Sequence, residues 1–264
     1  MIKTKDTVNG LRAAPKKCYL FLNLPDVKAK LCNFGAQNLL MIQTVIFDMD
    51  GVIVDTEPVH HYAYHQHFSH LNIEVTGEMY ASFTGFSTKN TYQRLKESFE
   101  IPFEIEELVN RKREIFNEAF DSKEDLYLIE GVEDLIKNLH ANGMQLVLAS
   151  SASNVTIHRI FNRFGLHQYF THIVSGEDFP KSKPDPAIFV HAAFLSGTPK
   201  ENCIVIEDST NGIKAANAAG IYCVGYNSVN SKLQDLSLAD TVIQHFSELD
   251  YEKVRNIEGK KIAG

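Results

Sequence analysis

Five acidic side chains follow two apolar segments of this 264-residue chain. Asp48, Asp50 and Asp55 follow the segment "TVIF", and Glu207 and Asp208 end or follow "CIVI". If these segments are neighbouring strands, four or five carboxylates converge on one crevice, and their negative charge requires a cation. Hard oxygen ligands suit Mg²⁺, which keeps several waters and takes one or two protein carboxylates plus a substrate oxygen. A single aspartate at a strand end often caps the next helix, but the whole set favours a magnesium site.

Two further segments carry groups that suit a phosphate. "LASSASN" ends in Ser150, Ser151 and Ser153 and then opens a helical pattern, and hydroxyls with free N–H groups at a helix start favour an anion. "KSKPDPAIF" places Lys181 and Lys183 in a proline-flanked loop. A fixed ammonium that faces both a carboxylate and a phosphate neutralises both. Each signal is weak alone, because serines cap many helices and loop lysines are usually exposed, but together they indicate phosphate chemistry.

The elements that must position these groups alternate along the chain. "TVIFD", "QLVLAS", "HIVS", "CIVIED" and "YCVGY" are short apolar runs without a half-exposed alternation, which is typical of central strands in a parallel sheet covered on both faces. Helical patterns separate them, as in "NVTIHRIFNRFG", where Gly165 predicts the helix end. We therefore expect an α/β fold, a doubly wound Rossmann-like parallel sheet core.

One interval breaks this alternation. Residues 57–128 contain only helical patterns, which is too long for a crossover helix and too regular for a loop. We expect an inserted all-helical cap domain that leaves the core at the carboxyl end of the first strand, over the edge where open α/β sheets bind ligands. The predicted organisation is a basic, poorly ordered N-terminal extension (1–40), a core (41–56 and 129–252), the cap (57–128) and a C-terminal tail (253–264).

Four motifs occur in a fixed order: "FDMDG", "LASSAS", "KSKPDP" and "IEDSTNG". With them, the segment from Met41 to about Asp250 resembles the haloacid dehalogenase-like hydrolases, in the subgroup with a helical cap that contains β-phosphoglucomutase and small phosphosugar phosphatases. The resemblance implies roles for the motif residues. It implies that Asp48 is the nucleophile that becomes an aspartyl-phosphate, that Asp50 is the general acid and base, and that Lys183 is the motif lysine. Ser150 and the backbone around Ser151 would bind the phosphate. The implied ligands of Mg²⁺ are Asp48, Asp50 (through its carbonyl), Glu207 and Asp208.

The spacing of the two motif aspartates agrees with this chemistry independently. Asp48 can attack phosphorus in line only if its own charge is screened, and Mg²⁺ with Lys183 would provide that screening. Asp50 lies two residues on, on the same face of an extended chain, so it can protonate the leaving oxygen and later deprotonate a water. We expect Asp55, beside the linker to the cap, to position backbone instead.

The cap is expected to select the substrate. Thr56 and His60 lie at the hinge, and His60 aligns with a hinge histidine of β-phosphoglucomutase that helps organise its acid/base. The loop "GFSTKN" corresponds to the substrate-specificity loop, where Thr88 replaces the arginine with which the mutase holds the second phosphate, and Lys89 is next to it. Lysine is a poor substitute for a bidentate arginine. His61 and His65 lie one helical turn apart, but without a third ligand they are expected to face solvent rather than hold a metal.

Charge and cysteine content limit the partners and the compartment. Residues 1–40 contain seven Lys and Arg but two Asp and Glu, so the remaining chain is strongly acidic. An acidic body argues against nucleic-acid binding. The four cysteines have no metal-type spacing, which indicates a reducing, cytoplasmic compartment, and no apolar stretch suits a membrane. We expect a small phosphorylated metabolite as the partner, and a monomer or weak dimer.

Three functions are compatible with these patterns. The first is a Mg²⁺-dependent phosphatase for a small phosphorylated metabolite, and the second is a β-phosphoglucomutase-like phosphotransferase, whose aspartyl-phosphate would meet a sugar hydroxyl instead of water. The third is a response-regulator receiver, which also combines acidic residues, a lysine and an aspartyl-phosphate. A receiver has no helical insertion after its first strand and no use for Asp50 as an acid, which disfavours the third function. Thr88 in place of the mutase arginine favours the first function over the second.

Overall fold

A six-stranded parallel sheet forms the centre of the core. The computed structural model describes residues 41–228 and 231–259; the predicted extension 1–40, with Cys18 and Cys32, and residues 260–264 of the predicted tail lie outside the described residues. The strands are β1 (Thr44–Phe47), β2 (Gln145–Ser150), β3 (His172–Ser175), β4 (Cys203–Glu207), β5 (Tyr222–Tyr226) and β6 (Thr241–Ile243). Their order is β3-β2-β1-β4-β5-β6, and every pair is parallel. The predicted doubly wound fold is confirmed, with β6 as an additional edge strand.

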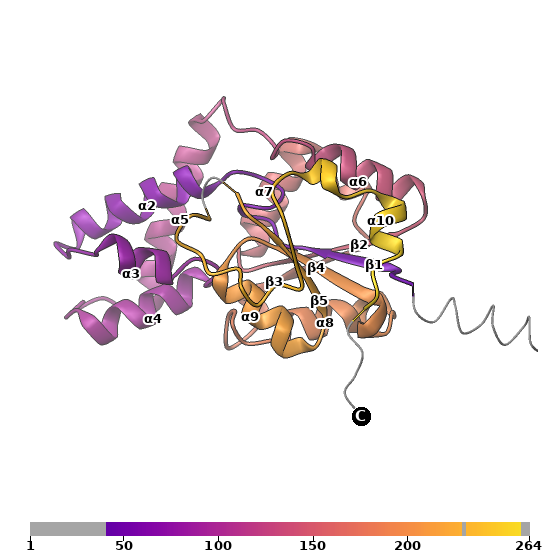
Figure 1. Ribbon diagram of the computed structural model, residues 1–264. Helices are drawn as coiled ribbons and strands as arrows, with labels where there is room; N and C mark the ends of the chain where they lie inside the picture. Colours follow the sequence, from indigo (N-terminus) through magenta and orange to yellow (C-terminus); the bar gives the residue numbers. More distant parts are fainter. Residues whose placement is uncertain (1–40, 229–230, 260–264) are drawn as a thin grey trace, which may run out of the picture. The chain divides into compact units, whose positions relative to one another are not determined.

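Helices cover both faces of this sheet (Figure 1). On one face lie α6 (Val132–Ala141), α7 (Asn154–Phe164) and α10 (Tyr251–Arg255), and on the other lie α8 (Ala187–Ser196) and α9 (Thr210–Ala219). Alternate residues of β1 supply the two layers: Val45 and Phe47 pack in the first layer, and Ile46 packs in the second. Burial on both faces explains why the strands are continuous apolar runs.

Short polar and glycine signals set the helix ends. The hydroxyl of Ser153 accepts the Thr156 N–H at the start of α7, and the hydroxyl of Ser209 accepts the Gly212 N–H at the start of α9. Gly165 ends α7 with a φ of 65°, the left-handed conformation predicted for that position. Within the described ranges, four 3₁₀ segments complete the core. They are Leu166–Gln168, Gly176–Asp178, Lys200–Asn202 and Phe246–Glu248.

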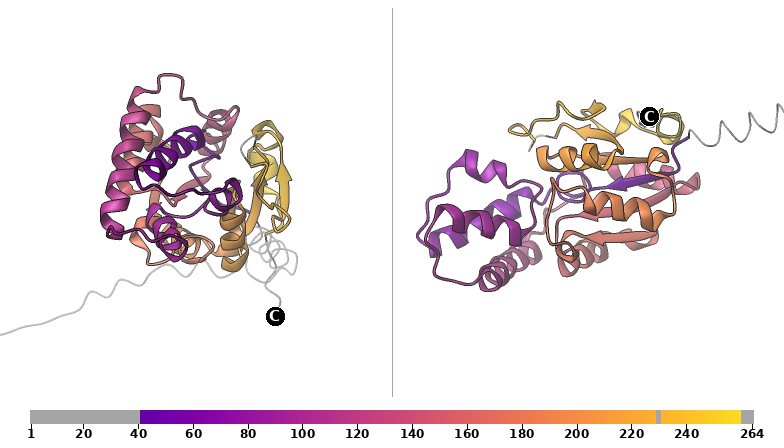
Figure 2. Two further views of the ribbon diagram at one scale, coloured as in Figure 1. Left: turned by 90° about the vertical axis from the view of Figure 1, so that its left-hand side faces the viewer. Right: turned by 90° about the horizontal axis from the view of Figure 1, so that it is seen from below.

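The predicted cap consists of four helices: α2 (Glu57–His70), α3 (Gly77–Ser82), α4 (Thr88–Ser98) and α5 (Ile105–Ser122). They enclose a small apolar cluster of their own, to which Tyr64, Tyr92 and Leu108 contribute. The two linkers pair through an antiparallel bridge between Val54 and Leu128. Figure 2 shows the cap beyond the carboxyl ends of the core strands. The helix α3 is an addition to the predicted pattern.

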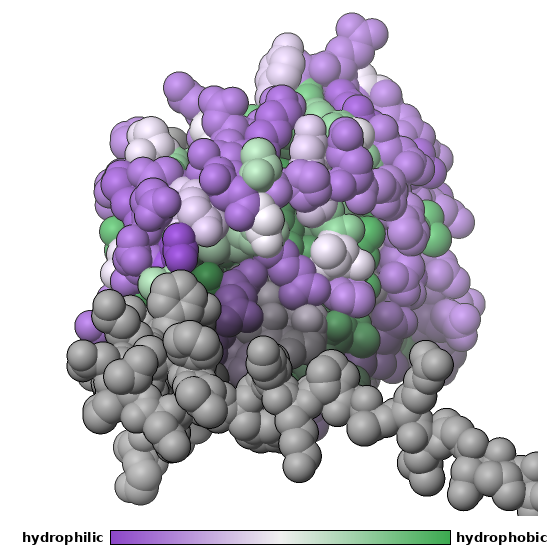
Figure 3. All heavy atoms as spheres, turned by 90° about the vertical axis from the view of Figure 1, so that its right-hand side faces the viewer, coloured by the Kyte–Doolittle hydropathy of each residue, from purple (hydrophilic) through white to green (hydrophobic). Residues whose placement is uncertain are grey.

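The core extends beyond its predicted end at residue 252. The helix α10 runs to Arg255, and Val254 has no exposed surface because it packs in the same layer as α6. The face of the core away from the cap presents mainly hydrophilic side chains, with apolar ones scattered among them (Figure 3). Cys203 and Cys223 are buried in strands β4 and β5. No helix in the described part of the chain has the length and apolar character to cross a bilayer.

Candidate active site

The acidic residues meet at the carboxyl edge of the sheet, between β1 and β4. Strand order reverses at this point, because the chain continues from β1 to β2 on one side and returns to β4 on the other. Phe47 is paired with Ile206, and the Asp48 N–H donates to the Ile206 carbonyl at 3.0 Å, so Asp48 and Glu207 lie side by side. Ligand sites of open α/β sheets form at such reversal points. The predicted convergence of Asp48, Glu207 and Asp208 is therefore present.

Lys183 is inserted among these carboxylates. It comes from the loop before α8, is fully buried, and its ammonium donates to Asp48 Oδ1, to Glu207 Oε1 at 2.8 Å and to the Ala149 carbonyl at 3.1 Å. Burial alone would lower the pKa of Lys183, but the negative charges of Asp48 and Glu207 raise it above its ordinary value. Lys183 therefore holds its positive charge beside Asp48, whereas Lys181 is exposed.

Glu207 uses both carboxylate oxygens inside the protein. Oε1 accepts from Lys183, and Oε2 accepts the N–H groups of Asp208 and Ser209, both at 2.8 Å, and the Ser209 hydroxyl at 3.0 Å. Gly212 allows this arrangement, since a Cβ there would lie 1.7 Å from Oε1. This geometry disfavours the predicted role of Glu207 as a direct metal ligand, because both of its oxygens are occupied by protein donors. Glu207 instead fixes Lys183 and the loop that carries Asp208.

Asp48 and Asp208 carry the charge that remains for a cation. Burial raises the pKa of Asp48 above its ordinary value, and Glu207 and Asp50 add to this effect against Lys183. Burial also raises the pKa of Asp208, again with Glu207 and Asp48 contributing, and the Ser231 hydroxyl donates to this side chain at 3.2 Å. Because each carboxylate disfavours ionisation of the other, a cation bound between them would stabilise the state in which both are ionised.

The donor set fits Mg²⁺. Within the described ranges, no group of three or more His, Cys, Asp or Glu side chains has the arrangement of a metal cage. Mg²⁺ does not need one, because it is held by one or two carboxylates together with water and substrate oxygens. A Cβ at Gly51, which has a φ of 83°, would lie 2.2 Å from Asp208 Oδ2, so only glycine lets the turn after Asp50 pass this carboxylate. Asp48, Asp208 and the Asp50 carbonyl would hold the ion.

Asp50 lies in surroundings different from those of Asp48. The Thr56 hydroxyl donates to its Oδ1, and the His60 Nε2 lies 3.5 Å from the same oxygen. Burial opposes ionisation, but His60 and Thr56, with a smaller effect of Lys112, outweigh it and lower the pKa of Asp50. Thr56 is fully buried and absent from the pocket lining, so it is a positioning residue for Asp50 and not the predicted substrate contact.

Lys112 was not predicted from the sequence. It lies on α5, is almost fully buried, and its Nζ is 2.8 Å from His60 Nδ1 and 4.3 Å from the centre of the Tyr64 ring. A lysine donor at Nδ1 places the imidazole proton on Nε2, toward Asp50. Burial lowers the pKa of Lys112 to about 7, although Asp50 and Glu57 oppose this. A single lysine in an amphipathic helix of mixed charge carries no signal of such a role.

The predicted phosphate-binding serines separate into two roles. Ser150 is fully buried, its hydroxyl accepts the Ala152 N–H at 3.1 Å, and it does not line the pocket. Ser151 lines the pocket, and its hydroxyl donates to the Gly85 carbonyl of the cap at 2.6 Å. In this arrangement Ser150 shapes the loop after β2, and Ser151 joins that loop to the cap.

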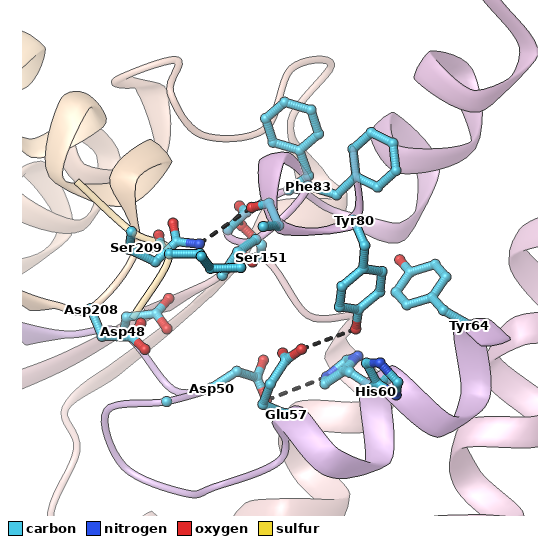
Figure 4. Close-up of a pocket in the computed structure, with 18 of the residues that line it drawn as sticks. Asp48, Asp50, Glu57, His60, Tyr64, Tyr80, Phe83, Ser151, Asp208 and Ser209 are labelled. Atoms are coloured by element: carbon cyan, nitrogen blue, oxygen red, sulfur yellow. Dashed lines mark hydrogen bonds and ion pairs between the residues drawn. The ribbon is translucent and has the colours of Figure 1, made fainter. Parts of the chain in front are cut away.

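A cavity of about 310 Å³ lies between these groups and the cap (Figure 4). Its volume is at the lower end of the range of roughly 300–1,000 Å³ for small-molecule sites, which suits a ligand of metabolite size. Thr88 lines it as predicted, but Lys89 is exposed and outside the lining, so the predicted substrate contact of Lys89 is absent here. Glu57 and Tyr80, which the sequence did not single out, also line it.

The chain is similar in sequence to a family of hydrolases and to named phosphatases. The model of the family described as haloacid dehalogenase-like hydrolase matches residues 45–226. The "Phosphorylated carbohydrates phosphatase" of Thermotoga maritima is 30% identical over 184 residues, which are 68% of this chain and 82% of the relative. "Fructose-1-phosphate phosphatase YqaB" of Escherichia coli is 30% identical over 181 residues, 68% of this chain and 94% of the relative.

A solved structure shows the same architecture. The crystal structure of β-phosphoglucomutase from Clostridium difficile has a TM-score of 0.71 and 26% identity, covering 81% of this chain and 96% of that one. The chain spans only 19% of the length of another relative, "Protein SUPPRESSOR OF QUENCHING 1, chloroplastic" of Arabidopsis thaliana, at 29% identity over 201 residues, 75% of this chain.

The chain belongs to the haloacid dehalogenase-like hydrolases. The predicted family and the predicted enzyme class, a phosphomonoester hydrolase, are thereby confirmed. The response-regulator alternative is wrong, because the family model extends from β1 to β5 of a core with a helical insertion.

Proposed function

We propose that this protein is a Mg²⁺-dependent phosphatase that hydrolyses a small phosphorylated metabolite, such as a sugar phosphate, through an aspartyl-phosphate at Asp48. The observation that carries the proposal is the buried Lys183 ammonium on Asp48 Oδ1, beside Asp208 and beneath a cavity of metabolite size. The names of two relatives, which are phosphatases of phosphorylated carbohydrates and of fructose 1-phosphate, support the substrate class.

In the first step, a carboxylate oxygen of Asp48 forms a bond to phosphorus, and the bond between phosphorus and the ester oxygen breaks. Lys183 offsets the charge of the nucleophile, and bound Mg²⁺ would supply further charge neutralisation. Asp50 donates a proton to the leaving oxygen. A phosphate dianion beside Asp50 raises its pKa, because like charges disfavour ionisation, and this prepares it as the acid.

In the second step, Asp50 acts as a base. It removes a proton from a water, whose oxygen bonds to phosphorus while the bond to Asp48 breaks and inorganic phosphate leaves. The low pKa that Thr56 and His60 give Asp50 suits this step. The closed contact of Ser151 with Gly85 limits access of bulk water to the site.

A panel of phosphomonoesters with purified protein and Mg²⁺, read by release of inorganic phosphate, tests this function. We expect turnover of at least one sugar or polyol phosphate and none with Asp48→Asn. A protein that releases no phosphate from any ester, p-nitrophenyl phosphate included, would contradict the proposal.

A second candidate is a β-phosphoglucomutase-like phosphotransferase, which the structural likeness to the Clostridium difficile mutase favours. It shares every step up to the aspartyl-phosphate. A coupled assay of β-glucose 1-phosphate with a catalytic amount of glucose 1,6-bisphosphate distinguishes the two, since only the mutase converts the monophosphate to glucose 6-phosphate without releasing inorganic phosphate.

We also propose a cytoplasmic location, because Cys203 and Cys223 are buried in apolar strands of the core, where a reduced thiol packs as a small hydrophobic side chain.

A further inference from the structure

A carboxylate and a phenol face the substrate cavity from the cap. Glu57 is the first residue of α2 and Tyr80 lies on α3, and the Tyr80 hydroxyl donates to Glu57 Oε1 at 3.0 Å. Both line the cavity, and Glu57 lies beside Asp50, with Tyr80 farther from Asp48 and Asp208 (Figure 4). The described part of the chain offers Glu57 no other hydrogen-bond donor. The free acceptor positions of this carboxylate are therefore available to a ligand.

The cap side of the cavity lacks cationic side chains. None of the described residues that line the cavity is Lys or Arg. The imidazoles of His60 and His61 do line it, but Nδ1 of His60 lies 2.8 Å from the Lys112 Nζ, and burial lowers the pKa of His61, with His65 contributing, so neither is a fixed cation. Lys183 and Lys112 are covered by the groups that they contact, and Lys89 faces solvent.

This charge distribution discriminates between substrates. One phosphate is accommodated at Asp48 by Lys183 and a cation. A second phosphate would have to enter the cap side, where it would lose its hydration and gain as a neighbour the Glu57 carboxyl group, whose pKa burial raises to about 7, but no cationic partner. The α4 N-terminus also approaches the cavity at Thr88, but Ser87 already caps it by accepting the Asn90 N–H. Hydroxyl groups, in contrast, find an acceptor in Glu57 and a phenol in Tyr80.

We propose that Glu57 and Tyr80 are the specificity-determining pair of this enzyme: they bind hydroxyl groups on the uncharged part of a monophosphate ester, and the cap side rejects substrates that carry a second phosphate. The inference rests on the proposed phosphatase function and names its substrate class as hydroxyl-rich monophosphates. Sites that bind a hydroxyl through a buried polar group reject ligands that leave the group unpaired.

Matched substrates test this pair in the full-length protein. Fructose 1-phosphate is compared with fructose 1,6-bisphosphate, and glucose 6-phosphate with glucose 1,6-bisphosphate; p-nitrophenyl phosphate, which has no hydroxyl on its leaving group, is the third probe. We expect kcat/KM for the better monophosphate to exceed that for its bisphosphate by about 100-fold or more. We expect Glu57→Gln to lower kcat/KM for that monophosphate relative to p-nitrophenyl phosphate by about 10-fold, and Tyr80→Phe to change the ratio in the same direction.

Glu78→Gln is the matched control, because it removes a carboxylate from an exposed position of α3 next to the cavity. Its ratio of monophosphate to p-nitrophenyl phosphate activity should stay within about twofold of the wild type. Equal activity of the wild type on both members of a pair overturns the inference, and so does an unchanged ratio in Glu57→Gln. Both results leave the proposed function standing if p-nitrophenyl phosphate is still hydrolysed, whereas failure of that function would remove all turnover.

Discussion

Two aspartates of one tripeptide have opposite electrostatic surroundings. Burial raises the pKa of Asp48, with Glu207 and Asp50 adding to it, whereas His60 and Thr56 outweigh burial and lower the pKa of Asp50. Pairs of titratable groups with diverging pKa values are the usual basis for dividing nucleophile and acid/base roles between identical side chains. The proposed roles of Asp48 as nucleophile and Asp50 as acid and base agree with the different neighbours of the two side chains. Different variants therefore test the two residues.

Asp50→Asn should slow hydrolysis of alkyl phosphates by roughly 10²- to 10⁴-fold, because proton transfer to the leaving oxygen is lost. With p-nitrophenyl phosphate, whose leaving group needs no proton, formation of the phosphoenzyme should be affected less than its hydrolysis. Rapid-quench measurement should then find phosphorylated protein accumulating in the variant. Asp55→Asn, five residues farther along the chain beside the linker and outside the cavity lining, is the control; equal losses in Asp50→Asn for both leaving groups would contradict the acid role.

Lys112→Met should lower kcat by on the order of 100-fold with a smaller change in KM, because His60 loses the donor that orients it toward Asp50. Methionine fills a similar buried volume, so the protein should remain folded. The pH dependence of kcat should also shift, which a purely structural role would not produce. Lys89→Met, at an exposed position of the same cap, should leave both parameters unchanged. A variant at Lys112 with wild-type kcat and pH profile would remove it from the site.

At the scale of elements, side chains of the core hold the loop between α3 and α4. The Asn211 amide on α9 donates to the carbonyls of Thr84, at 2.7 Å, and Ser82, at 3.1 Å, and the Ser151 hydroxyl reaches the Gly85 carbonyl. A Cβ at Gly85 would lie 2.6 Å from the Ser209 hydroxyl, so this approach requires glycine. The cap therefore rests on the catalytic loops themselves, and its closure is coupled to their geometry.

Asn211→Ala should weaken this closed contact. We expect faster amide hydrogen exchange in residues 81–90 and a fall in kcat/KM of about 10-fold, since a looser cap admits water and misplaces the substrate. Asn217→Ala changes the same residue type on the same helix, where the amide donates to the Leu238 carbonyl at 3.4 Å and not to the cap, and should change neither quantity. Unchanged exchange in Asn211→Ala would show that the loop is held by other contacts.

The elements that sequence patterns predicted are those with strong burial. The five predicted strands are continuous apolar runs because both faces of the sheet are covered, and the helix end at Gly165 follows from its left-handed backbone. The missed elements lack these signals. Strand β6 has three residues, two of them exposed, and α3 has six residues and no fully buried side chain. Tertiary contacts, not local periodicity, define both of them.

At the scale of the whole molecule, the sequence motifs predicted the acidic residues and the lysine of the site but not the cap side chains that surround it. Asp48, Asp50, Lys183 and Asp208 were identified because their order along the chain is distinctive. Lys112, Glu57 and Tyr80 come from different cap helices and meet only after folding, so no spacing connects them. The same limit explains why Thr56 was expected at the substrate and is found beneath Asp50.

The cation requirement is a property of the whole charge distribution. Chelation with EDTA should abolish turnover, and Mg²⁺ should restore it. Without metal, ionised Asp208 opposes folding, because its raised pKa means that stability is greatest below that pKa and falls as pH rises through it. Asp208→Asn should therefore raise the melting temperature in EDTA at pH 8 by roughly 2–4 °C. Mg²⁺ should stabilise the wild type but not the variant; equal stabilisation of both would place the ion elsewhere.

The central claim is that Asp48 becomes covalently phosphorylated during turnover. Acid quench of the protein with p-nitrophenyl phosphate and Mg²⁺, followed by borohydride reduction and peptide mass analysis, measures this directly, because an aspartyl-phosphate is reduced to homoserine. We predict homoserine at position 48, its absence without substrate, and its absence in Asp48→Asn. Turnover with an unmodified Asp48, or with the label at another residue, would contradict the claim.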